Sequence, residues 1–436
     1  MSFPPENDLD AARAFCNHLR GTAGFDESGS LLLWNGSYWS PDDSARSLTR
    51  SYVDWLLGVP VPPTRCASSR WLESSRSQPS IQRVVHLTKQ FLPGVPSLDT
   101  EGCPIFIGES VIEVRTGAVK SSYPDRGNRS SIAVTYDPDA VCPSWLKFLE
   151  EIIPDESVRS FAQKVMGYCL TYETSEQYIF IALGSGANGK SVFLETIKEI
   201  LGKLAGALPP EALMVGKGNV HRSESAALRG KTLALVPELP RSAKLNASLV
   251  KSLTGGDSVT ERDLYKASFE HKPTAKYWIN ANHPPDVDID DYGLVRRIVV
   301  VPFDVTIPPE KRDSDLRDRL RTESSGIVNW LLDGCRRWYT EGLALPAVVQ
   351  AATIKAISST NTARIFIRER VVHHDGEAIS AKELRASYLE WCTFNAVIPE
   401  GQRTLGLEMR RAGYKNAKRD GGKSFWCDGM LRPGDC

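Results

Sequence analysis

The segment GSGANGKS places two residues that could do chemistry, Lys190 and Ser191, behind a glycine-rich run in the pattern GxxxxGK[ST]. Glycines let backbone N–H groups curl around phosphates, and a helix that begins at the lysine adds positive potential. The lysine of this pattern reaches the β- and γ-phosphates, and the hydroxyl binds Mg²⁺. We therefore predict a site for ATP and Mg²⁺ formed by Gly184, Ser185, Gly186, Ala187, Asn188, Gly189, Lys190, Ser191 and Val192. The alternative, a glycine-rich turn with an exposed lysine, explains the flanking strand and helix patterns less well.

A carboxylate that could complete this chemistry is Glu238, just after the apolar run 231–236. ATP hydrolysis needs such a group at the end of a neighbouring strand, where it orients water and holds the metal shell. We predict that Glu238 is catalytic and shares the metal with Ser191. In isolation Glu238 could merely solvate a strand end, but the glycine-rich loop in the same region favours the catalytic role.

The elements that must position these residues are four continuous apolar runs, at 178–183, 231–236, 275–280 and 297–303. Such runs predict strands buried on both faces. Helical segments separate them, including one after the loop that Gly202 should end and one before it that Pro154 should interrupt. Alternating strands and helices predict an α/β fold with a parallel sheet. We assign residues 141–345 to this domain and its helical collar.

The flanking regions have different patterns. Residues 1–140 predict a mixed α/β region, with a helix at 9–19, a hairpin at Asn35-Gly36 and a strand-turn-strand at 110–124. The Ser-, Pro- and Arg-rich stretch 62–80 predicts a loop. Residues 346–436 predict a helix after a capping box at Ser380 and Glu383, a second helix that ends before Gly413, and a basic hairpin near 420–422. This order is that of a winged-helix domain.

Composition narrows the function classes. The 53 Lys and Arg residues balance the 53 Asp and Glu residues, so any nucleic-acid contact must use local patches or a channel. The nine cysteines form no CxxC pair, which argues against a zinc site or a disulfide framework. No apolar run reaches membrane-spanning length and no signal peptide is visible. We therefore expect no membrane partner and a cytoplasmic location.

Four motifs in order resemble the superfamily III helicases, which are AAA+-related, and in particular the phage, plasmid and poxvirus primase-helicases. They are GSGANGKS, PELPRSAKLN, KSLTGGDSVTERDLYKASFEHKPTAKYWINANHPP and DDYGLVRRIVVVPF. The resemblance implies that Asn282 contacts the γ-phosphate or the attacking water. It also implies that Arg296 or Arg297 enters the nucleotide site of a neighbouring subunit, so that the chain works as a homo-oligomer, a ring of six by similarity. Many relatives carry two adjacent acids where this chain has Pro237-Glu238, which leaves Asp257 as a helper at the metal or as a turn residue.

Two basic regions are candidates for DNA contact. In the resembling family, the hairpin between Glu238 and Asn282 points into the ring channel, which assigns Arg262, Tyr265 and Lys266 to DNA. The alternative is a solvated turn. Near the C-terminus, Arg410, Arg411 and Lys415 lie in a basic stretch that could meet duplex or origin DNA. Winged helices also dock proteins, so that alternative stays open.

These patterns lead to one main functional prediction. We expect an ATP-dependent DNA helicase or translocase that acts on single-stranded and forked DNA in the replication of a phage, prophage or plasmid within a bacterial cytoplasm. The resemblance implies 3′ to 5′ movement and leaves room for a separate primase or initiator as partner. The clustered acids of a primase are not found before residue 140, so we predict no primer synthesis by this chain. The alternatives are an ATP-controlled DNA-binding initiator or regulator with little unwinding, and a ring that binds nucleotide without hydrolysis.

Overall fold

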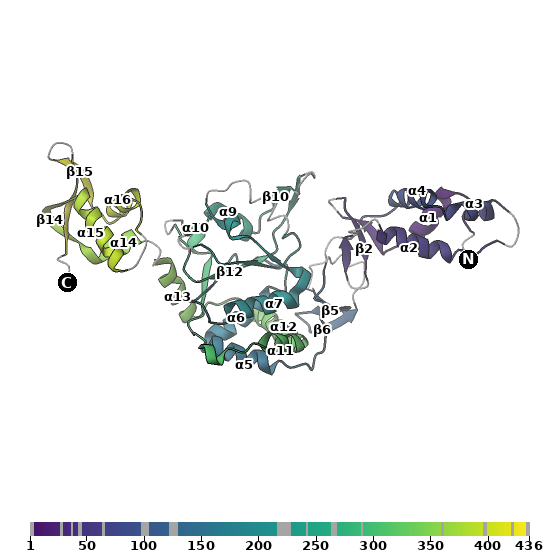
Figure 1. Ribbon diagram of the computed structural model, residues 1–436, viewed down its shortest axis with the longest axis horizontal. Helices are drawn as coiled ribbons and strands as arrows, with labels where there is room; N and C mark the ends of the chain where they lie inside the picture. Colours follow the sequence, from purple (N-terminus) through teal and green to yellow (C-terminus); the bar gives the residue numbers. More distant parts are fainter. Residues whose placement is uncertain are drawn as a thin grey trace.

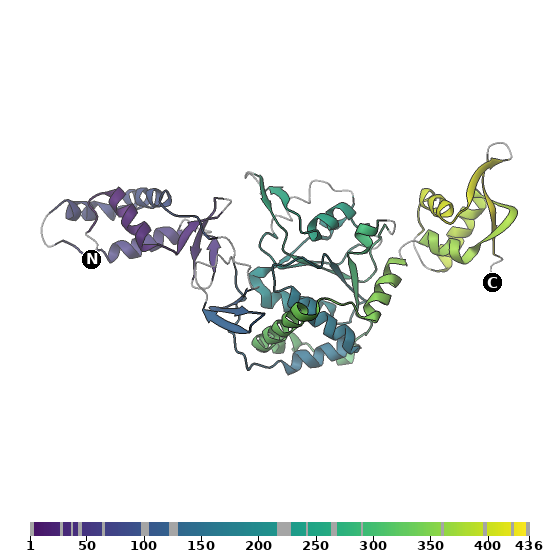
Figure 2. The ribbon, with the colours of Figure 1, turned by 180° about the vertical axis from the view of Figure 1, so that it is seen from behind.

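Three units follow one another along the chain in the computed structural model (Figure 1). The structure describes residues 4–26, 29–35, 38–41, 46–62, 66–96, 104–121, 130–215, 228–240, 243–262, 268–288, 291–358, 362–395, 399–419 and 423–432. Seen from the opposite side in Figure 2, the N-terminal and C-terminal units again lie at opposite ends of the central unit. The central unit holds the predicted nucleotide residues.

The N-terminal unit is a small helical cluster with a three-stranded sheet. Its elements are α1 (Asp8–His18), β1 (Ala23–Phe25), β2 (Leu31–Trp34), β3 (Trp39–Pro41), α2 (Arg46–Leu57), α3 (Ala67–Ser75) and α4 (Gln78–Lys89). The predicted hairpin is confirmed, because β2 and β3 pair antiparallel with Trp34 opposite Trp39. Their ring centroids lie 6.0 Å apart, so the two indoles pack across the strand pair.

The loop predicted for residues 62–80 is wrong, since this stretch contains α3 and the start of α4. Its buried residues in α3 are Ser68, Trp71, Leu72 and Ser75, which follow the spacing i, i+3, i+4, i+7 of one helix face. Two of these four core positions carry serine. Composition therefore does not reveal the buried face of α3, although the buried residues recur with the period of a helix.

The central sheet has five parallel strands in the order β13-β7-β12-β9-β8. They are β7 (Ile179–Leu183), β8 (Ala205–Ala207), β9 (Leu233–Val236), β12 (Lys276–Ala281) and β13 (Ile298–Pro302). The four predicted strands and their parallel order are confirmed. The edge strand β8 was missed, because the sequence AGA carries no apolar signal. Strand β7 lies between β12 and β13, so the strand order reverses at β7. Ligands of open α/β sheets bind at the carboxyl ends of the strands, at the point where the strand order reverses.

Helices cover both faces of this sheet (Figure 1). Along β7, Phe180 and Ala182 join one core cluster while Ile179 and Ile181 join the other, as strand alternation requires. The first face is covered by α5 (Pro143–Ile152), α6 (Glu156–Tyr168), α7 (Lys190–Leu201), α11 (Leu316–Thr322) and α12 (Ser324–Glu341). The second face is covered by α9 (Ala247–Thr254), α10 (Tyr292–Val295) and α13 (Ala347–Ser358).

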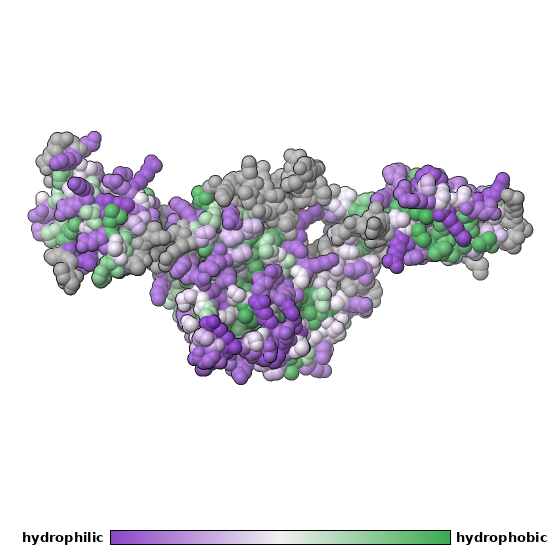
Figure 3. Space-filling view, in the orientation of Figure 1, coloured by the Kyte–Doolittle hydropathy of each residue, from purple (hydrophilic) through white to green (hydrophobic). Residues whose placement is uncertain are grey.

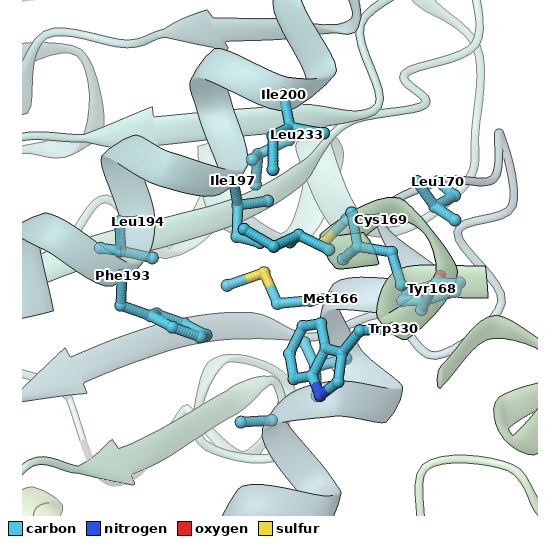
Figure 4. Packing of buried hydrophobic residues seen from close by; sticks show 14 of the residues in the cluster. Met166, Tyr168, Cys169, Leu170, Phe193, Leu194, Ile197, Ile200, Leu233 and Trp330 are labelled. Atoms are coloured by element: carbon cyan, nitrogen blue, oxygen red, sulfur yellow. The ribbon is translucent and has the colours of Figure 1, made fainter. Parts of the chain in front are cut away.

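The core of the first face interleaves side chains from four elements (Figure 4). Met166 of α6 lies among Phe193 and Ile197 of α7 and Trp330 of α12, and Leu233 of β9 closes the cluster from the sheet. Trp145 stacks on Phe193 with centroids 5.7 Å apart. Because α7 begins at Lys190, this packing fixes the helix that carries the predicted catalytic lysine.

A second three-stranded sheet packs on the same core. It consists of β4 (Pro104–Ile107), β5 (Ser110–Glu113) and β6 (Ala118–Ser121), with β5 in the middle. Its buried residues Ile105, Ile107 and Ile112 belong to the cluster that includes Trp145 and Phe180. The hydrophobic core of the central unit therefore reaches back to β4. The predicted domain limits at residues 140 and 345 stay predictions.

The remaining elements are a hairpin above the sheet and the C-terminal unit. The hairpin pairs β10 (Val259–Arg262) with β11 (Ser268–His271). The C-terminal unit contains α14 (Thr362–Arg370), β14 (Val371–Ser380), α15 (Ala381–Phe394), α16 (Gln402–Arg411), β15 (Lys415–Arg419) and β16 (Lys423–Leu431). Its sheet has the antiparallel order β14-β16-β15. The predicted cap is present, since Ser380 Oγ accepts from the Glu383 amide at 3.1 Å.

Within the described ranges, no helix has the length and apolarity that a bilayer crossing requires.

Candidate functional site

The loop between β7 and α7 is built around backbone that side chains rarely adopt. Gly186, Ala187 and Gly189 have φ values of 98°, 50° and 80°. Gly184 also needs its lack of a side chain, because a Cβ there would lie 2.2 Å from the Phe303 carbonyl oxygen. Positive-φ residues interleaved with ordinary ones turn successive N–H groups toward one concave side. The loop therefore has the backbone of an anion cradle at the start of a helix.

Two hydrogen bonds hold this loop to the chain that follows β13. The Asn188 side chain, only 3% exposed, donates its Nδ2 to the Phe303 carbonyl at 3.0 Å. The Ile307 amide donates to the Ala187 carbonyl at 2.7 Å. A buried amide that is satisfied in this way fixes the loop instead of merely filling space. Asn188 is therefore a positioning residue of the loop.

Lys190 turns its side chain back across the loop. Its Nζ donates to three oxygens: the Gly184 carbonyl at 2.6 Å, Asn188 Oδ1 at 3.1 Å and Asn282 Oδ1 at 3.2 Å. The residue is 3% exposed, and this burial lowers the pKa of Lys190, while the charge of Glu238 acts in the opposite direction. The cation is thus held by neutral acceptors, which leaves its charge available for an anion.

Asn282 joins Lys190 to Glu238. Its Oδ1 accepts from Lys190, and its Nδ2 donates to Glu238 Oε1 at 2.5 Å. Glu238 follows β9, Asn282 follows β12 and Lys190 follows β7, so three parallel strands deliver these side chains to one edge of the sheet. The structure therefore brings together the lysine, the acid and the amide that the sequence singled out from distant segments.

Asn280 is a site residue that the sequence interpretation missed. Its Nδ2 donates to Ser191 Oγ at 3.2 Å, so it contacts the hydroxyl predicted to bind Mg²⁺. Asn280 and Asn282 are two residues apart at the end of β12 and therefore point to the same face. That alternation was the available signal, since Asn280 and Asn282 follow the apolar residues Tyr277, Trp278 and Ile279.

A cavity of about 600 Å³ adjoins the loop on its outer side. Ala187, Gly189 and Val192 form one wall, and α5 and α11 with the preceding segment form the others. The lining combines apolar and charged side chains: Phe148, Ile307, Leu316, Lys147, Lys311, Arg312, Arg319, Glu151 and Asp313. Ligand sites are commonly of this size and mixed character.

The two predicted arginines differ in their surroundings. Arg297 is 7% exposed, and its Nε donates to Thr254 Oγ1 at 3.0 Å while its Nη1 donates to the Gly293 carbonyl at 2.6 Å. Arg296 is exposed, and its Nη2 donates to Gln177 Oε1 at 3.0 Å. Both precede β13, at the end of the sheet opposite the loop. Strand β7 spans about 16 Å between these ends, so neither arginine shares an edge with its own Lys190.

The remaining predicted residues are only partly described. Tyr265 and Lys266 lie outside the described residues, and for Arg262 only the backbone in β10 is described. Asp257 is near Gly255, whose carbonyl accepts from Gln177 Nε2, so it lies at the end of the sheet away from Ser191. That position favours the turn role over help at the metal.

In the C-terminal unit, Arg410 and Lys415 are exposed. Arg411 also reaches the surface but donates Nη1 to the buried Glu408 at 2.6 Å, which gives it a structural task.

Two family models match the chain. Residues 12–154 match the family described as "D5 N terminal like", and residues 182–297 match a "Family of unknown function (DUF5906)". The second match begins in β7 and ends before β13, so it contains the loop, Glu238 and Asn282.

Relatives of known name come from large DNA viruses. A "Putative helicase" of Acanthamoeba polyphaga mimivirus is 27% identical over 326 residues, which cover 69% of this chain and 34% of the relative. A "Putative helicase" of Frog virus 3 is 25% identical over 271 residues, covering 58% and 28%. A "Putative primase" of African swine fever virus strain Badajoz 1971 is 24% identical over 343 residues, covering 72% and 35%. The chain spans about a third of the length of these relatives.

Among solved structures, the NrS-1 C-terminal region resembles the whole chain. It has 11% sequence identity and a TM-score of 0.50, and the alignment covers 97% of this chain and 99% of that one. At this identity the likeness concerns the fold, a mixed α/β architecture with a parallel sheet. The D5-type match and the named viral relatives agree with the resemblance drawn from the four motifs. The D5-type match and the viral relatives named helicase or primase therefore support a superfamily III primase-helicase of the D5 type.

Proposed function

We propose that this chain is the motor of an ATP- and Mg²⁺-dependent DNA helicase or translocase that works as a ring of identical subunits in replication. The observation that carries the proposal is the chain of contacts Lys190–Asn282–Glu238, with separations of 3.2 Å and 2.5 Å. A cation for phosphates, a polar sensor and a carboxylate for water are what phosphoryl transfer to water requires. They come from three strands and meet beside one helix N-terminus.

The residues of the loop fit a triphosphate with Mg²⁺. The positive-φ residues supply backbone donors, and Lys190 has an ammonium held only by neutral oxygens. Phosphate oxygens would replace these acceptors. Ser191 and Glu238 would hold the metal shell, with Asn280 orienting the serine hydroxyl. The bound metal would neutralise charge that develops on the phosphates.

The adjoining cavity supports a nucleotide over an inorganic phosphate compound. Its walls include Ala187, Gly189 and Val192 of the loop itself, so a ligand anchored by its phosphates there could extend into it. Phe148 and Ile307 offer apolar contact for a base, and the charged rim offers hydrogen bonds to a sugar.

The position of Arg296 supports an assembly of several subunits. It is exposed at the sheet edge away from its own loop, so a phosphate contact by this guanidinium requires a second protomer. Arginines supplied in this way are worth about 10³ to 10⁵ in rate. We assign Arg296 to the neighbour's nucleotide, and Arg297, which is buried and bonded within its own protomer, to holding the segment in place.

Two parts of the chain are assigned to DNA. The hairpin β10–β11 leads from α9 and would face the ring channel. The C-terminal unit has the order helix, strand, helix, helix, strand, strand with an antiparallel sheet, and we infer that it is a winged helix. Arg403, Arg410, Lys415, Lys418 and Lys423 are exposed on it, in keeping with the hydrophilic surface seen in Figure 3. We infer a cytoplasmic setting, with forked DNA as substrate and 3′ to 5′ movement.

The test measures ATP turnover and strand displacement on a forked duplex with the same protein. We expect Mg²⁺-dependent turnover stimulated by single-stranded DNA, and we expect Lys190→Ala and Glu238→Gln to lower turnover at least about 100-fold. A matched control is Lys355→Ala, which removes an exposed lysine from α13 outside the loop and the cavity and should leave turnover unchanged. An absence of ATP binding and turnover in the assembled protein would contradict the proposal.

The other function classes are separated by the same assays. DNA-stimulated turnover without displacement at any salt concentration would favour an initiator or regulator. Nucleotide binding with the same negligible turnover in the parent and in Glu238→Gln would favour a ring that binds without hydrolysis. Salt is controlled because counterion release weakens single-strand binding by about 0.7 log units per phosphate contact for each log unit of salt.

A further inference from the structure

Gln177 has an unusual backbone just before β7. Its φ is 57°, a left-handed value that glycine and asparagine adopt more readily than glutamine. Among the described residues, only Ala187 in the nucleotide loop and Asp428 in the C-terminal sheet share this property without being glycine. A long side chain is held in a strained backbone when its contacts over-determine the position. The contacts of Gln177 therefore indicate what it does.

The side-chain amide of Gln177 faces two different partners. Its Oε1 accepts from Arg296 Nη2 at 3.0 Å and from Arg297 Nη2 at 3.4 Å. Its Nε2 donates to the Gly255 carbonyl at 3.3 Å. One end of the amide thus holds the arginines that precede β13, and the other end holds the segment that follows α9.

The Gly255 segment is bound to the arginine segment by further contacts. Thr254 Oγ1 accepts from Arg297 Nε at 3.0 Å. Lys251 of α9 bridges to Asp291, the N-cap residue of α10, at 2.9 Å. The pKa of Arg297 is lowered by burial, as expected for a cation enclosed in this network. These contacts make the end of α9 and the Arg296 segment one connected structure.

The end of α9 leads directly into the hairpin. Helix α9 ends at Thr254, Gly255 follows, and β10 begins at Val259. Only residues 256–258 separate Gly255 from the base of β10–β11. Lys190, by contrast, lies at the other end of β7, about 16 Å away. The network thus connects Arg296 to the hairpin more directly than to the protomer's own nucleotide.

We propose that Gln177 is a positioning residue that couples Arg296, at the neighbour's nucleotide, to the hairpin β10–β11. This coupling rests on the proposed function, in which Arg296 acts on a neighbouring subunit and the hairpin meets DNA. Loss or gain of the phosphate contact of Arg296 moves the Gln177 amide, and the amide carries the movement to the Gly255 carbonyl. DNA at the hairpin influences turnover by the same route in reverse, as linkage requires.

The two ends of the amide can be separated by substitution. Gln177→Glu replaces the donor to the Gly255 carbonyl with an acceptor, so it removes the contact to Gly255, and its carboxylate forms an ion pair with Arg296 and Arg297. Gln177→Gly removes the contacts to the two arginines and to Gly255. It also relieves the backbone strain, so the variant is expected to fold. Asp428→Gly is the matched control, because it relieves the same kind of strain in the C-terminal unit.

The main measurement is the ratio of turnover with single-stranded DNA to turnover without it. We expect Gln177→Glu to lose stimulation, with a ratio near 1, and to lower basal turnover, because its carboxylate holds Arg296 within its own protomer. We expect Gln177→Gly to lose stimulation and also about tenfold in basal turnover, the size of one charge-assisted hydrogen bond. Asp428→Gly keeps the parent ratio. Parent-like ratios in both Gln177 variants would overturn the proposal.

A second measurement does not depend on turnover. Hydrogen exchange of the peptide that contains Gly255 to Arg262 is compared in the parent, Gln177→Glu and Arg296→Ala. We expect faster exchange in Gln177→Glu than in the parent, because the carbonyl of Gly255 loses its donor. Unchanged exchange would show that Gln177 does not hold this segment, even if the protein hydrolyses ATP as proposed. If exchange is altered in Gln177→Glu but the parent shows no turnover, the proposed function is wrong and the contact between Gln177 and Gly255 stands.

Discussion

At Lys190 of the candidate site, hydrogen bonds offset the cost of burying a positive charge. Burial to 3% exposure disfavours its charge, and the lowered pKa reflects this cost. Three oxygens, from Gly184, Asn188 and Asn282, offset the loss of water without supplying a full negative charge. A cation held by neutral acceptors is poised to exchange them for an anion. The same arrangement with a carboxylate partner would already be neutralised and would bind phosphate less well.

Asn280 allows a prediction at this scale. Asn280→Ala removes the donor to Ser191 Oγ, so the hydroxyl is less well oriented toward the metal. We expect the Mg²⁺ concentration for half-maximal turnover to rise about tenfold, as for other supporting residues of metal ligands. Mg²⁺ titration of turnover measures this, with Asn17→Ala, on the exposed surface of α1, as control. A Mg²⁺ dependence identical to the parent would remove Asn280 from the site.

Helices α14 and α16 of the C-terminal unit are joined through one buried carboxylate. Glu408, 2% exposed, accepts from Arg364 Nε at 2.8 Å and from Arg411 Nη1 at 2.6 Å. Burial alone would raise the pKa of Glu408, but the two arginine hydrogen bonds outweigh it, and the pKa is lowered. These contacts explain why Arg411 is less available to DNA than Arg410, although the two are adjacent in the basic stretch.

The sign of this shift predicts an acid effect on these two helices. Because the folded-state pKa lies below the ordinary value of 4.5, the stabilisation is complete above that pH and is lost as the pH falls through the folded value. We expect Glu408→Gln to cost about 2 kcal/mol at pH 7 and to weaken the acid dependence. Hydrogen exchange of peptides from α14 and α16 between pH 7 and about 2.5, corrected for intrinsic rates, measures both. Equal acid sensitivity in parent and variant would contradict this assignment.

At the scale of the whole molecule, the two ends of the parallel sheet have separate tasks. The carboxyl ends of β7, β9 and β12 carry Lys190, Glu238 and Asn282, whereas the amino ends of β7 and β13 carry Gln177, Arg296 and Arg297. A protomer therefore presents the proposed nucleotide site at one edge and a candidate arginine for another protomer at the opposite edge. Surfaces that differ in this way pair head to tail, and such contacts close into rings when the rotation permits.

Mixing experiments test this arrangement. Lys190→Ala and Arg296→Ala are each expected to be inactive alone, but an equal mixture forms rings in which about one quarter of the interfaces pair an intact Lys190 with an intact Arg296. Turnover should therefore return in part. Mixing Lys190→Ala with Glu238→Gln is the control, because every site then contains one lesion and no turnover returns. Independent subunits would give no recovery in either mixture.

Arg297→Ala should instead lower thermal stability, since the Thr254 hydroxyl and Gly293 carbonyl lose a buried donor.

Much of the fold was predictable because its determinants are local. Continuous apolar runs identified β7, β9, β12 and β13, and the positive-φ positions of the loop required the glycines that form its motif. The stretch 62–80 was mispredicted because Ser68 and Ser75 occupy core positions of α3, and β8 was missed because AGA carries no apolar pattern. In both cases small residues pack in a core that only the rest of the chain creates.

By itself, the sequence determined the parallel sheet, the loop at its edge, and Lys190 and Glu238 as candidate residues, whereas Asn282 became a candidate through the resemblance of the four motifs. It did so because backbone conformation and strand burial depend on neighbouring residues. Tertiary structure alone decided that Asn280 supports Ser191, that Arg297 is enclosed while Arg296 is exposed, and that Gln177 lies between Arg296 and Gly255. These are contacts between residues far apart in the chain. Their partners are chosen by packing and strand order, which no local spacing in the sequence specifies.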